Sequence, residues 1–279
     1  VYNLWNSGRR DMEEYGIDGL VIKINERDIF DKLGYTAKSP RGGIAYKFFA
    51  EESSTKILDV TFQVGRTGVV TPVAEMVPVD LSGSTVSRAT LHNFDEIQRL
   101  GVMIGDTVMV KKAGDIIPQI FDVITNLRTG VEKKIKRPKN CPVCKSQLIT
   151  DEHGAGIRII CPNKKCPAKE INRVIYFASR KCANIEGLGE STVTALHDAG
   201  YVTKISDIYK LKKEQILSLD GFKEKSANNL LEGINKARKL SLPVFIMSLS
   251  IPSVGEETSL DLAKYFKTKE NFLHATHND

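Results

Sequence analysis

Long apolar runs are missing from this 279-residue chain, and so is a strong charge excess. No stretch approaches the roughly 18 apolar residues that a membrane-spanning helix needs, and no charged-then-apolar leader opens the sequence. The 40 Lys and Arg residues outnumber the 34 Asp and Glu residues by a net charge of only +6. We therefore expect a cytoplasmic protein without a membrane partner, in which basic residues favour a nucleic-acid partner only where they cluster.

Cysteine is scarce as well, and four of the five cysteines stand in one cluster. Cys141 and Cys144 form a CxxC pair, sixteen residues follow, and Cys161 and Cys166 form a CxxxxC pair. This spacing is typical of a structural zinc site with four thiolate ligands, whereas disulfides are the alternative for a secreted chain. We predict a small zinc finger that depends on its metal for folding. The remaining Cys182 is expected to be a buried apolar residue.

Two short β-branched runs near the start of the chain each carry one lysine. Lys23 lies within residues 18–25 and Lys47 within residues 41–50. An ammonium group on a strand can be aimed at a phosphate or at developing negative charge. Most strand lysines, however, are the solvent-side residues of half-buried strands. On the residues alone both interpretations stay open.

Residues 57–124 alternate between short strands and Gly-rich turns. The pattern predicts strands at 57–65, 68–79, 85–90, 107–112 and 116–124, and a helix beginning at Asn93. Five strands with a helix before the fourth are typical of an OB-fold barrel, which commonly binds nucleic acid through exposed basic residues. The candidates are Arg66, Arg88, Lys111 and Lys112, with His92 as a weaker one. A solvated basic rim is the alternative.

Beyond Cys166 the hydrophobic period becomes helical, beginning at residues 168–179. Three similar units follow at 185–195, 219–227 and 251–259, each with an apolar residue, a tight turn and a helix start. This is a repeat of the helix-hairpin-helix kind, in which turn glycines and helix N-termini bind DNA phosphates without reading bases. The predicted contacts are Gly187, Gly189, Gly221 and Gly255. Lys223 and Ser253 stand where the second and third units lack a glycine.

Five stretches together resemble the bacterial NAD-dependent DNA ligases. They are 17–25 (IDGLVIKIN); 39–41 (SPR) with 44–48 (IAYKF) and 50–52 (AEE); 63–72 (QVGRTGVVTP); 85–93 (TVSRATLHN); and 105–106 (GD) with 113–118 (AGDIIP). The cysteine cluster and the hairpin repeat follow in the order found in that family. The resemblance covers essentially the whole chain.

The resemblance implies a multidomain α+β protein. Residues 1–52 would be the C-terminal part of an adenylation (nucleotidyltransferase) domain, 53–136 an OB-fold domain, 137–170 a zinc finger and 171–279 a truncated all-α helix-hairpin-helix domain. The expected assembly is a monomer bound to nicked double-stranded DNA.

The same resemblance implies a reaction. Such enzymes seal 3′-hydroxyl/5′-phosphate nicks in replication and repair, through enzyme-adenylate and DNA-adenylate intermediates, with NAD as the AMP donor. Lys23 and Lys47 match the lysines of the family's motifs IV and V, which contact the adenylate and neutralise its phosphate. Asp18 would lie near a divalent magnesium or manganese ion.

The sequence also departs from the family. Gly42 stands where these ligases usually have Trp, and Phe49 where they usually have Pro. No Lys-x-Asp-Gly nucleophile motif precedes Asp18, so we expect a piece of a longer enzyme that is inactive alone. We also expect its first fifty residues to be the least stable, because their strands need partners. The alternative is a non-catalytic DNA-binding or repair accessory module.

Overall fold

The computed structural model describes residues 4–5, 8–15, 17, 19–36, 39–48, 52–81, 83–113, 117–151 and 157–276. The chain divides into two compact units. The first unit comprises Val1–Thr61, Val73–Leu91 and Glu96–Ile135, and the second comprises Phe62–Pro72, His92–Asp95 and Lys136–Asp279. None of the helices in the described part of the chain combines the length and the apolar character that crossing a membrane requires.

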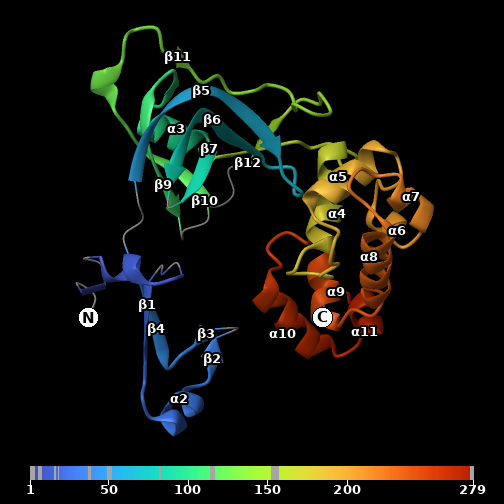
Figure 1. Ribbon diagram of the computed structural model, residues 1–279. Helices are drawn as coiled ribbons and strands as arrows, with labels where there is room; N and C mark the ends of the chain where they lie inside the picture. Colours follow the sequence, from blue (N-terminus) through green and yellow to red (C-terminus); the bar gives the residue numbers. More distant parts are fainter. Residues whose placement is uncertain are drawn as a thin grey trace. The chain divides into compact units, whose positions relative to one another are not determined.

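The first unit opens with a short 3-10 helix, η1 (Arg9–Met12), and a two-stranded antiparallel ladder, β1 (Gly19–Lys23) with β4 (Gly43–Lys47). In the chain, β1 and β4 are separated by α2 (Arg27–Leu33) and by the small pair β2 (Tyr35–Thr36) and β3 (Ser39–Pro40) (Figure 1). Both lysine-bearing strands predicted from the sequence are therefore confirmed. Val21 and Ile22, on opposite faces of the ladder, are 62% and 61% exposed, so this apolar ladder is covered on neither face.

A closed barrel follows, and it belongs to the first unit except for the parts of β5 and β6 within Phe62–Pro72. Its strands are β5 (Glu52–Val64), β6 (Val70–Leu81), β7 (Ser84–Thr90), β9 (Thr107–Ala113) and β10 (Ile117–Val123), in the spatial order β10-β7-β6-β5-β9. The helix α3 (Phe94–Leu100) precedes β9, the fourth barrel strand. Alternating side chains point inward, so Ala74, Met76, Val108 and Val110 are buried. The predicted five-stranded barrel with its inserted helix is confirmed.

Asp106 fastens the loop that follows α3 to the barrel. Its buried carboxylate accepts hydrogen bonds from Arg128 Nε (2.7 Å), Arg128 Nη2 (2.8 Å) and the Met103 amide (2.7 Å). Arg128 Nη2 also donates to the Gly101 carbonyl at 2.7 Å. Nearby, β8 (Met103–Ile104) pairs with β11 (Lys133–Lys134), while η2 (Thr125–Leu127) leads to Arg128. One buried carboxylate thus joins the segment 101–106 to Arg128.

The second unit is largely helical. Its helices are α4 (Pro167–Ala178), α5 (Glu190–Asp198), α6 (Ile205–Ile208), α7 (Lys213–Leu217), α8 (Glu224–Lys236), α9 (Leu242–Ser248), α10 (Glu256–Phe266) and α11 (Lys269–Leu273). A short antiparallel pair, β12 (Ile149–Asp151) with β13 (Arg158–Ile160), precedes them. Val174, Leu196, Ile208 and Leu230 lie in one hydrophobic core. Cys182 is buried, as expected.

Three helix pairs, α4/α5, α7/α8 and α9/α10, form the predicted hairpins. In each turn the residue two positions before the next helix's cap lies in the left-handed region: Gly187 (φ 82°), Gly221 (φ 84°) and Ser253 (φ 63°). Two residues later an extended residue caps the following helix: Gly189, Lys223 or Gly255. An extended cap accepts any residue, which is why Lys223 fits there, whereas Ser253 adopts a conformation that favours glycine.

We predict that Asp106→Ala destabilises the first unit by about 3 kcal/mol, because it leaves the Met103 amide and the Arg128 guanidinium without their acceptor. Hydrogen exchange at the Val108 and Val110 amides would report the loss. Asp31→Ala, which removes the exposed ion pair with Arg27, is the control and should cost less than about 0.5 kcal/mol. Equal, small effects of the two variants would contradict this role for Asp106.

Candidate functional site

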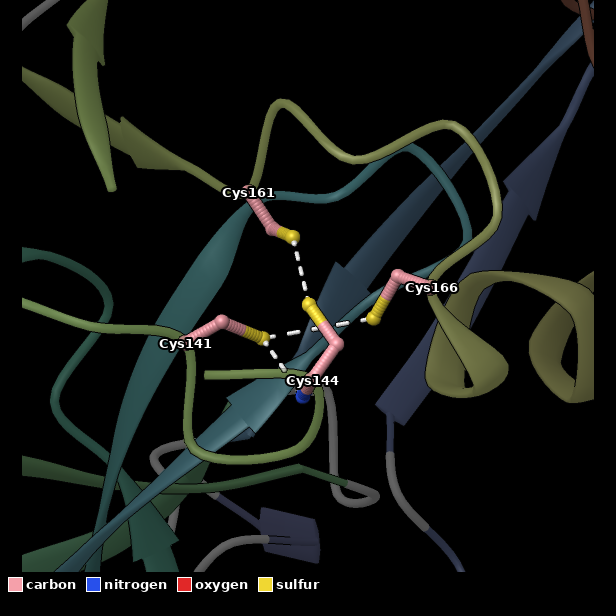
Figure 2. A group of neighbouring side chains, drawn as sticks. All are labelled: Cys141, Cys144, Cys161 and Cys166. Carbon is pink, nitrogen blue, oxygen red and sulfur yellow. Dashed lines mark hydrogen bonds between the residues drawn. The ribbon is translucent and has the colours of Figure 1, made fainter. Parts of the chain in front are cut away.

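The four clustered cysteines converge from three short segments (Figure 2). Cys141 and Cys144 sit on a tight turn closed by the bond from the Lys145 amide to the Cys141 carbonyl at 3.1 Å. Cys161 follows β13, and Cys166 is the N-cap residue of α4. The short β12–β13 pair and the helix start therefore bring two distant sequence pairs together.

The sulfur positions suit a tetrahedral metal site. All four Sγ atoms lie within 4.8 Å of one another, with Cys141 to Cys166 at 4.0 Å and Cys144 to Cys161 at 3.5 Å. A tetrahedral ion with Zn–S bonds of about 2.3 Å places its sulfurs about 3.8 Å apart. All five cysteines, each within the described residues, are free thiols. The cluster is compatible with zinc, as the spacing predicts.

Burial and hydrogen bonding shift the pKa values of these thiols in opposite directions. Loss of hydration raises the pKa of Cys161 to about 12 and also raises the pKa of Cys166, whereas hydrogen bonding with Ser146 lowers the pKa of Cys144 to about 5. A metal that binds all four sulfurs must therefore displace protons from buried thiols.

The tip of the β5–β6 hairpin, residues 62–72, packs directly on the cysteines. Val64 and Val70 share a hydrophobic cluster with Cys141, Cys161 and Cys166. The Cys161 amide donates to the Gly68 carbonyl at 2.9 Å. Gly68 has φ 94°, and a Cβ there would lie 2.9 Å from the Cys161 carbonyl oxygen, so glycine is required. The cysteine cluster thus joins this tip to the helical part of the second unit.

Lys169 is a buried cation beside the cluster that the sequence analysis missed. It is 6% exposed, and its Nζ donates to the Cys161 carbonyl at 3.1 Å. A buried lysine is rare unless a counter-charge lies nearby, and four thiolates around a divalent ion carry a net charge of −2. The sequence signal for this residue is its position three residues after Cys166, within the segment predicted to be a helix.

Arg66, a predicted DNA contact, lies on this same tip. Its guanidinium stands 3.7 Å from the centroid of the Tyr176 ring of α4. It lines a pocket of about 710 Å³ together with Arg180 and Lys181, which the sequence analysis did not single out. Asn172 on α4 donates to the Val64 carbonyl at 3.0 Å and fixes the tip against the helix. Three cations therefore gather on one surface of the second unit.

The other barrel candidates lie on the first unit. Arg88 Nε forms an ion pair with Glu75 Oε1 at 3.0 Å. Lys111 Nζ stands 4.4 Å from the Phe121 ring centroid, and the Lys112 amine contacts the Ser84 hydroxyl. Arg88 already has a carboxylate partner, whereas the two lysines contact an aromatic ring and a neutral hydroxyl.

Both ladder lysines fall on one face of the β1–β4 sheet. In the register Lys23 lies opposite Gly43 and Lys47 opposite Gly19, so the lysines are about 13 Å apart along the strands and each faces a glycine. Asp18, the predicted neighbour of a divalent ion, lies outside the described residues. At Gly42 a Cβ would lie 2.6 Å from Phe30 Cδ2, so Phe30 fills the space beside this residue.

The hairpin glycines occupy the turns that the sequence predicted for them. Gly187 and Gly189 line a pocket of about 530 Å³ that also includes Arg180 and Asn184. The backbone amides that open α5, α8 and α10 follow the capping residues directly. A helix N-terminus next to a basic side chain is a suitable site for a phosphate.

Comparisons with known proteins agree with these features. Residues 1–51 match the model of the NAD-dependent DNA ligase adenylation domain, 54–132 that of the NAD-dependent DNA ligase OB-fold domain, and 180–236 that of the SAM-like helix-hairpin-helix tandem. Phe49, a departure from the family's usual residues, lies outside the described residues.

Bacterial proteins named DNA ligase are similar to nearly the whole chain. The protein of Methylacidiphilum infernorum is 47% identical over 270 residues, which are 97% of this chain and 39% of that protein. The protein of Halalkalibacterium halodurans is 46% identical over 277 residues, 99% of this chain and 41% of that protein. The chain thus spans about two fifths of the length of these relatives. It carries domains of the NAD-dependent DNA ligases, and the resemblance to that family is confirmed.

Proposed function

We propose that this chain is the part of an NAD-dependent DNA ligase that completes the nucleotide site and holds the nicked duplex. The observation that carries the proposal is the single face shared by Lys23 and Lys47, in a segment that matches the family's adenylation domain. The whole enzyme would seal 3′-hydroxyl/5′-phosphate nicks with AMP taken from NAD. Its products would serve DNA replication and repair in the bacterial cytoplasm.

The two lysines would act on the adenylate phosphate. Both lysines lie on the same face of the β1–β4 ladder, each opposite a glycine in the register. Fixed positive charge next to the phosphate stabilises the charge that develops during AMP transfer. Asp18 would lie near a magnesium or manganese ion, which supplies further charge neutralisation when bound.

DNA would be held through its phosphates. The three hairpin turns present helix N-termini, with Gly187, Gly189, Gly221 and Gly255 at or beside them. Arg66 with its two basic neighbours, and Lys111 and Lys112 on the barrel, add cations, while Arg88 contributes less because Glu75 pairs with it. Contacts of this kind make binding salt-sensitive and tolerant of sequence.

Zinc would be the ion at the cysteine cluster. Cys141, Cys144, Cys161 and Cys166 provide the four sulfurs, and zinc would supply a structural cross-link rather than catalysis, since all four positions would be filled by protein. Lys169 would balance part of the negative charge. The cross-link would fix the hairpin tip that carries Arg66.

A non-catalytic DNA-binding module is the second candidate function, favoured by the fact that the hairpins and the barrel need no adenylate to bind DNA. The two functions differ in what Lys47 does. In a binding module Lys47 supplies at most one phosphate contact, whereas in a ligase it acts on the reacting phosphate.

In an enzyme of the relatives' full length, we predict that Lys47→Ala lowers the nick-sealing rate at least about 100-fold, while the affinity for nicked DNA stays nearly unchanged. Sealing of a labelled nicked duplex and a gel-shift titration would measure the two effects. Lys32→Ala, at the exposed end of α2, is the control and should change neither. Equal losses of sealing and binding in Lys47→Ala would favour the module.

The 279-residue chain alone is expected to gain no AMP when incubated with NAD and magnesium, because no Lys-x-Asp-Gly nucleophile occurs in it. Intact-mass spectrometry would measure the addition. A mass increase of one AMP on this polypeptide would contradict the assignment of the nucleophile to another part of the enzyme.

Lys169→Met is predicted to weaken zinc binding by about tenfold, because it removes the buried counter-charge and keeps the side-chain length. Competition with a colorimetric chelator would measure the affinity. Lys165→Met, which replaces an exposed lysine between Cys161 and Cys166, should leave the zinc affinity unchanged. Binding should also weaken as the pH falls, because zinc must displace protons from Cys161 and Cys166, whose raised pKa values keep the free thiols protonated. Purified chain without bound zinc would contradict the proposed metal.

A further inference from the structure

A second basic pocket lies in the helical part of the second unit. Its lining shares no residue with the cysteine cluster, and it includes Leu249 and Ser250 at the start of the α9–α10 connection. It has a volume of about 710 Å³ and is lined by residues of α4, α9 and α11 and of the segments after α6 and α8. Among the described residues, its lining includes none of the cysteines and none of the four hairpin glycines with predicted DNA contacts. The proposed ligase function leaves this pocket without a role.

Aromatic rings form much of its wall. Phe177, Tyr209 and Phe245 all line it. The Phe177 and Tyr209 rings meet edge to face with their centroids 6.2 Å apart, and the Tyr209 hydroxyl donates to the Ala237 carbonyl at 3.0 Å. This bond holds the Tyr209 ring in place. The wall therefore offers fixed aromatic surface of the kind on which a planar ring packs.

Its charge is entirely positive. Arg173, Arg238 and Lys269 line the pocket, and no Asp or Glu does among the described residues. Arg238 stands 5.0 Å from the Tyr209 ring centroid, and Lys269 Nζ stands 4.3 Å from that of Phe245. Cations held against ring faces keep their charge available for an anion.

Ser250 completes the lining. Ser250 Oγ is buried and, within the described part of the chain, has no hydrogen-bond partner. The residue adopts φ 55°, a left-handed conformation that glycine would adopt more easily. A buried hydroxyl is normally paired, so this one is suited to donate to a bound ligand.

We propose that this pocket binds a nucleoside monophosphate group. The base would pack on the Phe177, Tyr209 and Phe245 walls, and the phosphate would take hydrogen bonds from Arg238, Lys269 and Ser250 Oγ. The group could come from a free nucleotide or from the unpaired terminal nucleotide of a DNA strand. This inference is independent of nick sealing and of the adenylate lysines.

Calorimetric titration of the zinc-loaded 279-residue chain with AMP tests it. The chain carries Lys23→Gln and Lys47→Gln, so that AMP cannot use those lysines. Saturable binding is expected, weakened about tenfold by Arg238→Gln, by Lys269→Gln and by Ser250→Gly, each of which removes one hydrogen bond to phosphate. Ser250→Gly should not lower the melting temperature, since glycine suits the left-handed backbone. Lys236→Gln, outside the lining, should bind AMP normally.

Two further titrants complete the test. Inorganic phosphate should bind more weakly than AMP, because it gains nothing from the aromatic wall. The second titrant is a duplex with one unpaired terminal nucleotide, compared with a blunt duplex. If the unpaired end displaces AMP better, the strand end is the source of the bound group. Equal displacement by the two duplexes would identify free nucleotide as the source. No saturable binding at about 1 mM AMP, binding unaffected by the three variants, or phosphate binding as tight as that of AMP would overturn the proposal.

Discussion

The convergence of four thiols, three of them buried, is the interaction on which the second unit depends. The β12–β13 pair is short, and the segments that carry the cysteines have little apolar core of their own beyond the sulfurs, Val64, Val70 and Ile159. Four sulfurs within 4.8 Å of one another are suited to bind a metal. In so small a module, metal–sulfur bonds would contribute directly to the free energy of folding. This cluster holds together the hairpin tip, the cysteine turns and α4.

This arrangement explains where the basic residues of the second unit lie. Gly68 allows the hairpin tip to approach the Cys161 carbonyl, and Asn172 holds the Val64 carbonyl against α4. Arg66 then stacks on Tyr176, next to Arg180 and Lys181. A structural metal can thus shape a cationic surface without contacting any ligand. The same unit carries the three hairpin turns, whose helix N-termini also suit phosphates.

Much of the fold follows from short-range patterns in the sequence. Period-two alternation predicts the barrel strands, and the turns at Gly187, Gly221 and Ser253 have the left-handed residue where the repeat requires one. The CxxC and CxxxxC pairs predict their own convergence. Long-range packing is what the patterns do not contain. Lys169 reads as an ordinary helix lysine, Phe30 gives no sign that it covers Gly42, and the pocket around Ser250 is assembled from distant helices.

A metal bound to the cysteine cluster would hold the β5–β6 hairpin tip on the helical part of the second unit. Hydrogen exchange with and without a strong chelator tests it most directly. Metal removal should abolish protection of the Cys161 amide, which bonds to Gly68, and of the Gly65 amide, which bonds to Val69. The Val108 and Val110 amides in the barrel should stay protected. Unchanged protection at Gly65 and Cys161 after complete removal of the metal would contradict it.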